Sequence, residues 1–289
     1  MRDAASKGLS LMEETPLLPL LPSQEGLSES SSESGTLNAI RTDTVLSRLP
    51  IHNFSKSSRV TIEIDQKNIR GDAQLRWEVS YNERYGPARG LAYKLDTLII
   101  NRRIDELRGK GKEIPRLVRL GSLKQICAEL GCPVSGPNLK QIRQALMQNA
   151  STVINALVHY KDIHGCPSVL EATFTRYSVV LTGQALPETG ERATAVHIHL
   201  NEPYHRVISN VPVRPLDYDY QRQLSPATQR WYEIISYRIF AAIKYGKENA
   251  RITYGEYCMY SATTRTYDNN QMRVQMRRLH EPHLKSGYI

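Results

Sequence analysis

Residues 120–150, LGSLKQICAELGCPVSGPNLKQIRQALMQNA, predict a helix, a tight turn and a second helix. Ser122 followed by Gln125 is a capping box, which is typical of a helix N-terminus. Gly131 and Pro133 indicate where that helix ends, because glycine accepts a left-handed cap and proline cannot continue the helix. The apolar spacing then resumes and predicts a second helix that runs to residue 150.

The predicted second helix has two different faces. Its apolar residues recur at helical spacing and indicate a buried face. The opposite face has no acidic residue and carries side chains that can hydrogen-bond base edges or contact phosphate, namely Asn138, Lys140, Arg143, Gln144 and Gln148. This pattern favours a DNA-reading helix, whereas the alternative is a solvated helix of an ordinary α/β core. Helix-turn-helix spacing alone does not separate the two.

The flanking segments predict the remaining elements of a winged helix. Residues 59–80 alternate in polarity and predict a β-hairpin, and residues 91–99 predict a helix of about three turns. β-Branched residues return after residue 150 and predict a second hairpin, whose loop at 161–168 is interpreted as the wing tip. Lys161 and Arg176 lie near this loop and are predicted phosphate contacts. A strand at 195–200 is expected to complete the sheet.

A similar series follows a proline-containing linker predicted at residues 210–219. A helix is predicted from Ser225-Pro226, a short strand at Ile252, and two further helices that end at Pro282. Capping boxes begin these two helices, Thr253 with Glu256 and Asp268 with Gln271. The outward residues of the last helix again combine amides and cations: Asn270, Arg273, Gln275, Arg277 and Arg278. The sequence stops at Ile289, before a second wing.

Charge is distributed unevenly along the chain. The 289 residues have a formal net charge of +9. Residues 1–36 contain two basic and six acidic residues, a charge of −4, so the remainder carries +13. That excess favours a polyanionic partner. We therefore predict an α+β fold with a disordered acidic tail at 1–36, a winged-helix domain with an added hairpin at 37–211, and a second winged-helix domain at 212–289.

Four runs of sequence carry a resemblance to a known family. They are LAYKLDTLIINRRIDE (91–106), RLVRLGSLKQICAELG (116–131), PVRPLDYDY (212–220) and QRWYEIISYRIFAAI (229–243). The chain resembles bacterial plasmid replication initiators of the replication initiator A type, which have two winged helices. The resemblance implies binding to double-stranded origin repeats, recruitment of host proteins such as the helicase, and a homodimer that represses its own promoter. It also implies that helices at 136–150 and 268–281 are the two readers.

Two other functions remain open. A transcriptional regulator without a role in replication would use the same surfaces. A metal-dependent rolling-circle nicking enzyme would use His197 and His199, which point to one face of a strand, with Tyr232 or Tyr237 as the nucleophile. No third metal ligand is evident. We therefore predict a protein that is not an enzyme, with no catalytic residues, no metal and no cofactor.

The sequence also indicates where the protein acts. No apolar run approaches membrane-spanning length, and no signal peptide is recognised. The four cysteines form no C-x-x-C pair, which favours reduced thiols. We expect a cytoplasmic protein with no membrane partner.

Overall fold

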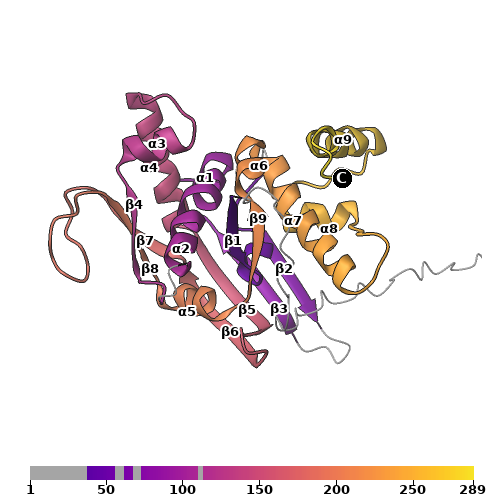
Figure 1. Cartoon of the computed structure of the whole chain (residues 1–289), viewed down its shortest axis with the longest axis horizontal. Coiled ribbons are helices and arrows are strands. Elements are labelled where there is room, and N and C mark those ends of the chain that lie inside the picture. Colours follow the sequence, from indigo (N-terminus) through magenta and orange to yellow (C-terminus); the bar gives the residue numbers. More distant parts are fainter. Residues whose placement is uncertain (1–37, 56–61, 68–72, 110–112) are drawn as a thin grey trace, which may run out of the picture.

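The structure is a computed structural model that describes residues 38–55, 62–67, 73–109 and 113–289 (Figure 1). The tail predicted at 1–36 lies outside the described residues, as do residues 59–61 and 68–72 of the hairpin predicted at 59–80. Over these described residues the fold mixes α and β structure, and its strands form three separate sheets.

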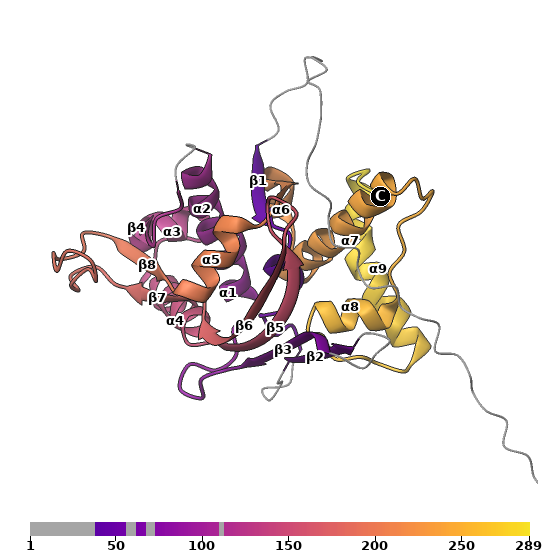
Figure 2. The same ribbon diagram turned by 90° about the horizontal axis from the view of Figure 1, so that it is seen from below.

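The largest sheet has four antiparallel strands. They are β2 (Ile62–Lys67), β3 (Ala73–Ser80), β5 (Val153–Lys161) and β6 (Pro167–Thr175), in the order β2-β3-β5-β6. The hairpin predicted at 59–80 is confirmed by the pairing of β2 with β3. Polarity alternates along these strands because one face of the hairpin is buried. The buried residues on that face are Ile62, Ile64, Trp77 and Val79. Figure 2 shows helices α1, α2, α5 and α7 on one side of this sheet.

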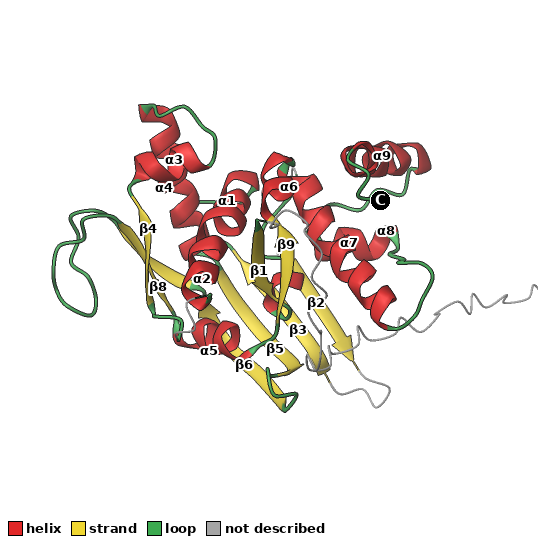
Figure 3. Cartoon of the chain, viewed as in Figure 1, coloured by secondary structure: helices red, strands yellow, loops and turns green. Residues whose placement is uncertain are grey.

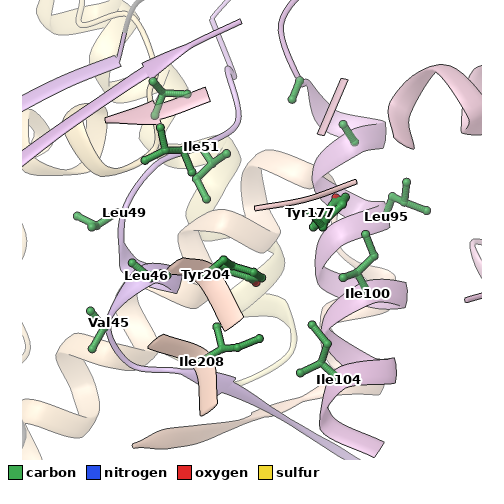
Figure 4. Close-up of a cluster of buried hydrophobic side chains, with 14 of the residues drawn as sticks. Val45, Leu46, Leu49, Ile51, Leu95, Ile100, Ile104, Tyr177, Tyr204 and Ile208 are labelled. Atoms are coloured by element: carbon green, nitrogen blue, oxygen red, sulfur yellow. The ribbon is translucent and has the colours of Figure 1, made fainter. Parts of the chain in front are cut away.

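A continuous helical segment packs beside this sheet. It consists of α1 (Gly90–Lys94), a π-helical stretch η2 (Leu95–Ile100) and α2 (Asn101–Arg108). All six residues of the π-helical stretch are buried, including Asp96. Figure 4 shows Leu95, Ile100 and Ile104 beside Tyr177, Tyr204 and Ile208, so this helix forms one wall of the core.

The predicted helix-turn-helix is confirmed. It consists of α3 (Leu123–Glu129) and α4 (Gly136–Ala150), and it follows strand β4 (Leu117–Gly121). The hydroxyl of Ser122 accepts from the backbone N–H of Gln125, and the Gln125 side chain accepts from the Ser122 N–H at 2.8 Å. Gly131 has φ +72°, the left-handed conformation that glycine adopts without steric cost. Local sequence therefore determines both ends of the turn.

The prediction of the wing was wrong. The loop at 161–168 joins β5 to β6, and β5 pairs with β3 rather than with β4. The three-stranded sheet that contains β4 has the order β4-β8-β7, with β7 at Tyr177–Val180 and β8 at Val196–Leu200. The strand predicted at 195–200 is confirmed as β8, and it pairs with β4 and with β7. Periodicity identifies strands but does not identify their partners, which explains the error.

The linker predicted at 210–219 was also wrong. Residues 213–217 form strand β9 (Val213–Asp217), which pairs with β1 (Ala39–Asp43) in a two-stranded sheet. The remaining elements nearby are η1 (Leu46–Arg48), α5 (Glu202–Asn210) and α6 (Tyr218–Gln223). Pro215 fits in β9 because this strand pairs only with β1, so an N–H on its other side is not needed.

After β9, the described chain contains helices and loops only (Figure 3). The helices are α6, α7 (Pro226–Lys244), α8 (Tyr254–Tyr260) and α9 (Asn269–Lys285). The capping box of Thr253 with Glu256 is confirmed, and the Asp268 side chain accepts from the Gln271 N–H at 2.8 Å. The predicted strand at Ile252 is absent from this described segment, and α9 continues through Pro282 instead of ending there.

A single buried cluster includes Ile62 and Trp77 together with Trp231, Tyr257 and Leu279 from the C-terminal helices. The domain boundary at residue 212 therefore stays a prediction. Within the described residues, no helix combines the length and the apolar composition needed to cross a membrane.

Candidate nucleic-acid interface

Helix α4 is held firmly by its inner face. Ile142, Ala145 and Leu146 are buried at helical spacing. Asn149 lies on the same face and is fully buried, and its amide donates to the Ala92 carbonyl at 2.8 Å. Its Oδ1 atom lies 3.1 Å from the Nε2 atom of His52. A buried amide with both ends bonded fixes the rotation of the helix, and this determines which side chains face outward.

Three of the five residues predicted on α4 project freely. Lys140, Arg143 and Gln144 are exposed, and within the described chain no hydrogen bond or ion pair holds them. Asn138 and Gln148 are instead partly buried and hold neighbouring backbone. Asn138 donates to the Pro133 carbonyl at 2.8 Å, and Gln148 donates to the Tyr85 carbonyl at 2.9 Å. These two amides position the turn before α4 and the loop beside its C-terminal end.

Helix α9 shows the same division. Asn270, Arg273, Arg277 and Arg278 are exposed. Gln275 is half-buried, and its Oε1 atom accepts from the Tyr254 hydroxyl at 2.7 Å, which ties α9 to α8. The predicted reader Gln275 therefore has a structural partner.

The structure places the two predicted wing contacts, Lys161 and Arg176, in different environments. Lys161 is exposed at the end of β5, and its contact with phosphate stays a prediction. Arg176 is only 5% exposed, and its Nη2 atom lies 2.5 Å from Oδ2 of Asp96, in the geometry of a close ion pair rather than an aligned hydrogen bond. The prediction for Arg176 was wrong, because a side chain buried against a carboxylate cannot reach phosphate in this structure.

Arg176 belongs to a buried polar cluster around Asp96. The Asp96 carboxylate also accepts from the Tyr177 hydroxyl at 2.7 Å and lies 3.0 Å from the Nε2 atom of His52. Burial alone would raise the pKa of Asp96, but Arg176, His52 and Tyr177 together hold this pKa below its ordinary value. The cluster is therefore a charged structural support inside the core.

Five exposed cations of α4 and α9 differ from many other arginines of the described chain in having no ion pair, whereas Lys285 at the end of α9 pairs with Glu281. Many arginines elsewhere pair with an acid, including Arg41, Arg103, Arg108, Arg116, Arg230 and Arg238. Among the described residues, no ion pair involves Lys140, Arg143, Arg273, Arg277 or Arg278. Helix α4 contains no acid at all, and α9 contains only Glu281. These cations are thus available to an external polyanion.

The two helices lie far apart on the molecule. Figures 1 and 2 both place α4 and α9 at opposite ends of the long axis, with α1 and α7 between them. The sequence does not indicate this arrangement, since it depends on how α7 packs on α1.

The residues proposed for nicking chemistry are not gathered into a metal site. His197 is buried, and its Nδ1 atom lies 3.1 Å from the Ala195 carbonyl. Tyr232 and Tyr237 are buried, and their hydroxyls are bonded to the Asp217 N–H and to Arg48. Within the described residues, no group of three or more His, Cys, Asp or Glu could hold a metal ion.

One exposed segment was missed by the sequence analysis. The loop at 181–195 joins β7 to β8 and contains exposed Arg192 between Gly190 and the β8 strand. Gly183 and Gly190 have φ +87° and +72°. These glycines were the available turn signals, and they mark this loop as the hairpin tip of the β4-β8-β7 sheet.

Two histidines anchor the C-terminal half of α9, which predicts a pH-dependent stability. The His280 ring packs on Trp231 with 4.8 Å between centroids, and His283 is fully buried with its Nδ1 atom 2.5 Å from the Tyr220 hydroxyl. Burial lowers the pKa of both histidines below 6.5. The unfolded chain therefore takes up protons first, and the free energy of unfolding should fall as pH drops below about 6.5.

Denaturant unfolding followed by tryptophan fluorescence at pH 7.5, 6.5 and 5.5 measures this effect. His280→Phe keeps an aromatic ring on Trp231 and removes one of the two titrating groups, so it should reduce the pH dependence and leave the part due to His283. Equal stability at all three pH values would contradict the proposed anchoring.

Comparisons with known proteins show a distant structural likeness. No protein-family model and no curated protein matches the chain. The chain is similar to a crystal structure of domains 2–3 of RctB, with a TM-score of 0.39 and 12% identity over 80% of each chain. It is also similar to a selenomethionine derivative of the same two domains, with a TM-score of 0.37, 13% identity, and coverage of 74% of this chain and 80% of that one.

Proposed function

We propose that this protein binds double-stranded DNA sequence-specifically through α4 and α9, and that it does so at a plasmid replication origin. The observation that carries the proposal is the exposed face of α4, where Lys140, Arg143 and Gln144 project without an intramolecular partner in the described chain. Cations of this kind bind phosphate, and Arg and Gln can also read base edges.

The order of elements supports a winged helix for the first unit. Helix α1–α2, strand β4, helices α3 and α4, and the β7–β8 hairpin follow one another, with β8 between β4 and β7. In this interpretation α4 enters the major groove and the 181–195 loop is the wing. That loop carries Glu188 and Glu191 beside Arg192. Because these acids repel phosphate, α4 supplies most of the phosphate contacts of the first unit in this proposal.

Helices α7, α8 and α9 form the second unit. Its third helix presents Asn270, Arg273 and Arg277, whose spacings of three and four residues place them on one face. Because α4 and α9 lie at opposite ends of the molecule, we propose that they contact separate parts of one DNA site. Such a DNA site extends over more than one groove segment, and the repeats of a replication origin provide a site of this kind.

The remaining roles follow from the resemblance to plasmid initiators. In this proposal the protein acts by binding and not as an enzyme. Host proteins such as the helicase supply the unwinding, and a homodimer represses the promoter. A transcriptional regulator is the competing function, and the nature of the DNA site distinguishes the two: direct repeats beside an AT-rich stretch support an initiator, whereas a single palindrome supports a repressor.

The test is fluorescence anisotropy with DNA from upstream of the gene and with a scrambled duplex, over a salt series. Specific binding should exceed binding to the scramble by a factor on the order of 10³ or more, and it should weaken steeply with salt. A plasmid carrying the bound fragment should then replicate only when the protein is present. Equal weak binding to both duplexes contradicts DNA recognition, and specific binding without plasmid replication contradicts the initiator role.

A further inference from the structure

An aromatic groove lies where the two ends of the described chain meet. We use this name for a cavity of about 410 Å³ whose apolar and aromatic lining consists of Ala39, Pro215, Leu216, Tyr220, Tyr232 and Tyr288. The polar residues Asp217 and Ser286 also line it. Its residues come from β1, β9, α6, α7 and the segment after α9. DNA recognition by α4 and α9 does not use it.

The rings of the groove form a continuous apolar wall. Tyr220 and Tyr288 stack with 5.6 Å between centroids, and Tyr232 meets Tyr288 edge-on at 4.9 Å. The Tyr232 and Tyr220 hydroxyls are bonded to the Asp217 N–H and to His283. Tyr232 is buried, so the partly exposed Tyr220 and Tyr288 supply the accessible ring surface of the groove. Burial raises the pKa of Tyr288 to about 12, so this hydroxyl stays neutral at neutral pH. The Asp217 carboxylate also lines the groove, and it accepts from the Tyr220 N–H at 2.9 Å. Grooves lined by aromatic rings are suited to proline-rich peptides in the polyproline II conformation.

The chain contains a segment of matching chemistry. Residues 15–23 read TPLLPLLPS, with prolines at positions 16, 19 and 22. Polyproline II has three residues per turn, so prolines spaced by three fall along one face of such a helix. The repeat distance is about 9 Å, from roughly 3.1 Å per residue. The segment carries no charge between residues 15 and 24.

The connection between segment and groove is short. The described chain begins at Asn38, whose carbonyl accepts from the Tyr218 N–H at 2.9 Å, and the next residue, Ala39, lines the groove. Fifteen residues, 24–38, connect the segment to this point. A random-coil tether of fifteen residues has a root-mean-square span of about 21 Å, which corresponds to a millimolar effective concentration of its free end.

We propose that the aromatic groove binds residues 15–23 of the same chain, with the prolines of the PxxPxxP repeat packed on the tyrosine rings. At a millimolar effective concentration, even a weak contact keeps the groove occupied. The N-terminal segment thereby joins the contacts that hold the C-terminal end of the chain beside β1 and β9.

The experiment uses a fluorescein-labelled peptide of residues 13–24, EETPLLPLLPSQ, in trans. Anisotropy is measured against the full-length wild type and against the full-length Pro16→Ala/Pro19→Ala/Pro22→Ala variant. The variant should bind the peptide about tenfold more tightly, because an intramolecular segment at about 1 mM no longer competes with a peptide Kd near 100 μM. The control peptide EETLLPPPLLSQ has the same composition without the spacing of three and should not bind.

Groove variants are made in the triple-proline background. Tyr288→Ala removes one ring, and Ala39→Lys places a charge at an exposed lining position without removing a buried contact. Both should weaken peptide binding at least tenfold, with unchanged circular dichroism for Ala39→Lys. The proposal is overturned if the two peptides bind equally, if wild type and the proline variant bind the peptide equally, or if Ala39→Lys has no effect. It is also overturned if light scattering shows a wild-type dimer that the proline variant loses, because the segment then binds a second copy.

Discussion

Arg176→Ala is expected to lower the free energy of unfolding by about 3–5 kcal/mol, because it leaves the Asp96 carboxylate buried without its cation. Both side chains are almost fully buried, and the charged atoms lie 2.5 Å apart. Desolvation by itself lowers the pKa of Arg176, but the neighbouring carboxylate outweighs it and raises this pKa. The guanidinium therefore stays charged and continues to compensate Asp96 at every pH at which the protein is folded.

The pH dependence of this contribution follows from Asp96. The pKa of Asp96 is depressed in the folded chain. Its stabilising contribution is therefore present above the ordinary carboxyl pKa of about 3.9 and is lost as pH falls through the depressed value. At pH 7 the full effect of Arg176→Ala should be measured by denaturant unfolding.

A double variant separates charge from packing. Arg176→Ala/Asp96→Asn removes the uncompensated charge and keeps an acceptor for the Tyr177 hydroxyl, so it should be more stable than Arg176→Ala alone. Lys161→Ala is the matched control near the loop at 161–168, and it should leave stability within about 0.5 kcal/mol of wild type because its side chain is exposed. A single variant as stable as wild type would show that Arg176 is not a structural cation.

The burial of Arg176 illustrates which structural features could be predicted from the sequence and which could not. Helix starts, turns and the β2–β3 hairpin could be predicted, because capping residues, glycines and periodicity act over a few positions. A signal for the buried ion pair was also present: Asp96 lies inside the apolar run LDTLII, and a buried carboxylate requires a cation. The identity of that cation could not be predicted, since Arg176 comes from 80 positions further along the chain.

The pairing of the strands could likewise not be predicted from the sequence. The β5–β6 hairpin follows α4 directly, and so it was predicted as the wing, yet its cross-strand contacts are with β3. Strand β9 was predicted as a linker because its partner β1 is more than 170 residues away. In the candidate site, composition predicted the polar face of α4 but not that Asn138 and Gln148 hold backbone carbonyls. Contacts between distant parts of the sequence decide the strand partners and the Gln148 contact, whereas the Asn138 contact depends on the geometry of the turn five residues before it.

Arg273→Ala is the substitution expected to affect DNA recognition most clearly. The side chain is exposed in the first turns of α9, and within the described residues it has no ion pair or hydrogen bond. If it grips a guanine with two hydrogen bonds, its loss costs about 1–3 kcal/mol, or roughly 5- to 150-fold in Kd. The loss should be concentrated at one base position, so substitution of that base pair in the site should cost the variant little further.

Two substitutions make this result interpretable. Arg143→Ala tests α4 at the other end of the molecule, and if the two helices contact separate parts of one site the double variant should lose the sum of the two free energies. Arg76→Ala changes the net charge equally, but Arg76 lies on β3 beside Glu171, so binding should change by less than twofold.

Competition titrations against single-base variants of the site measure the position dependence. An equal loss on every duplex, with a shallower salt dependence, would assign Arg273 to phosphate. Loss of affinity for Arg76→Ala equal to that for Arg273→Ala would instead show that only overall charge matters, and recognition by α9 would be wrong.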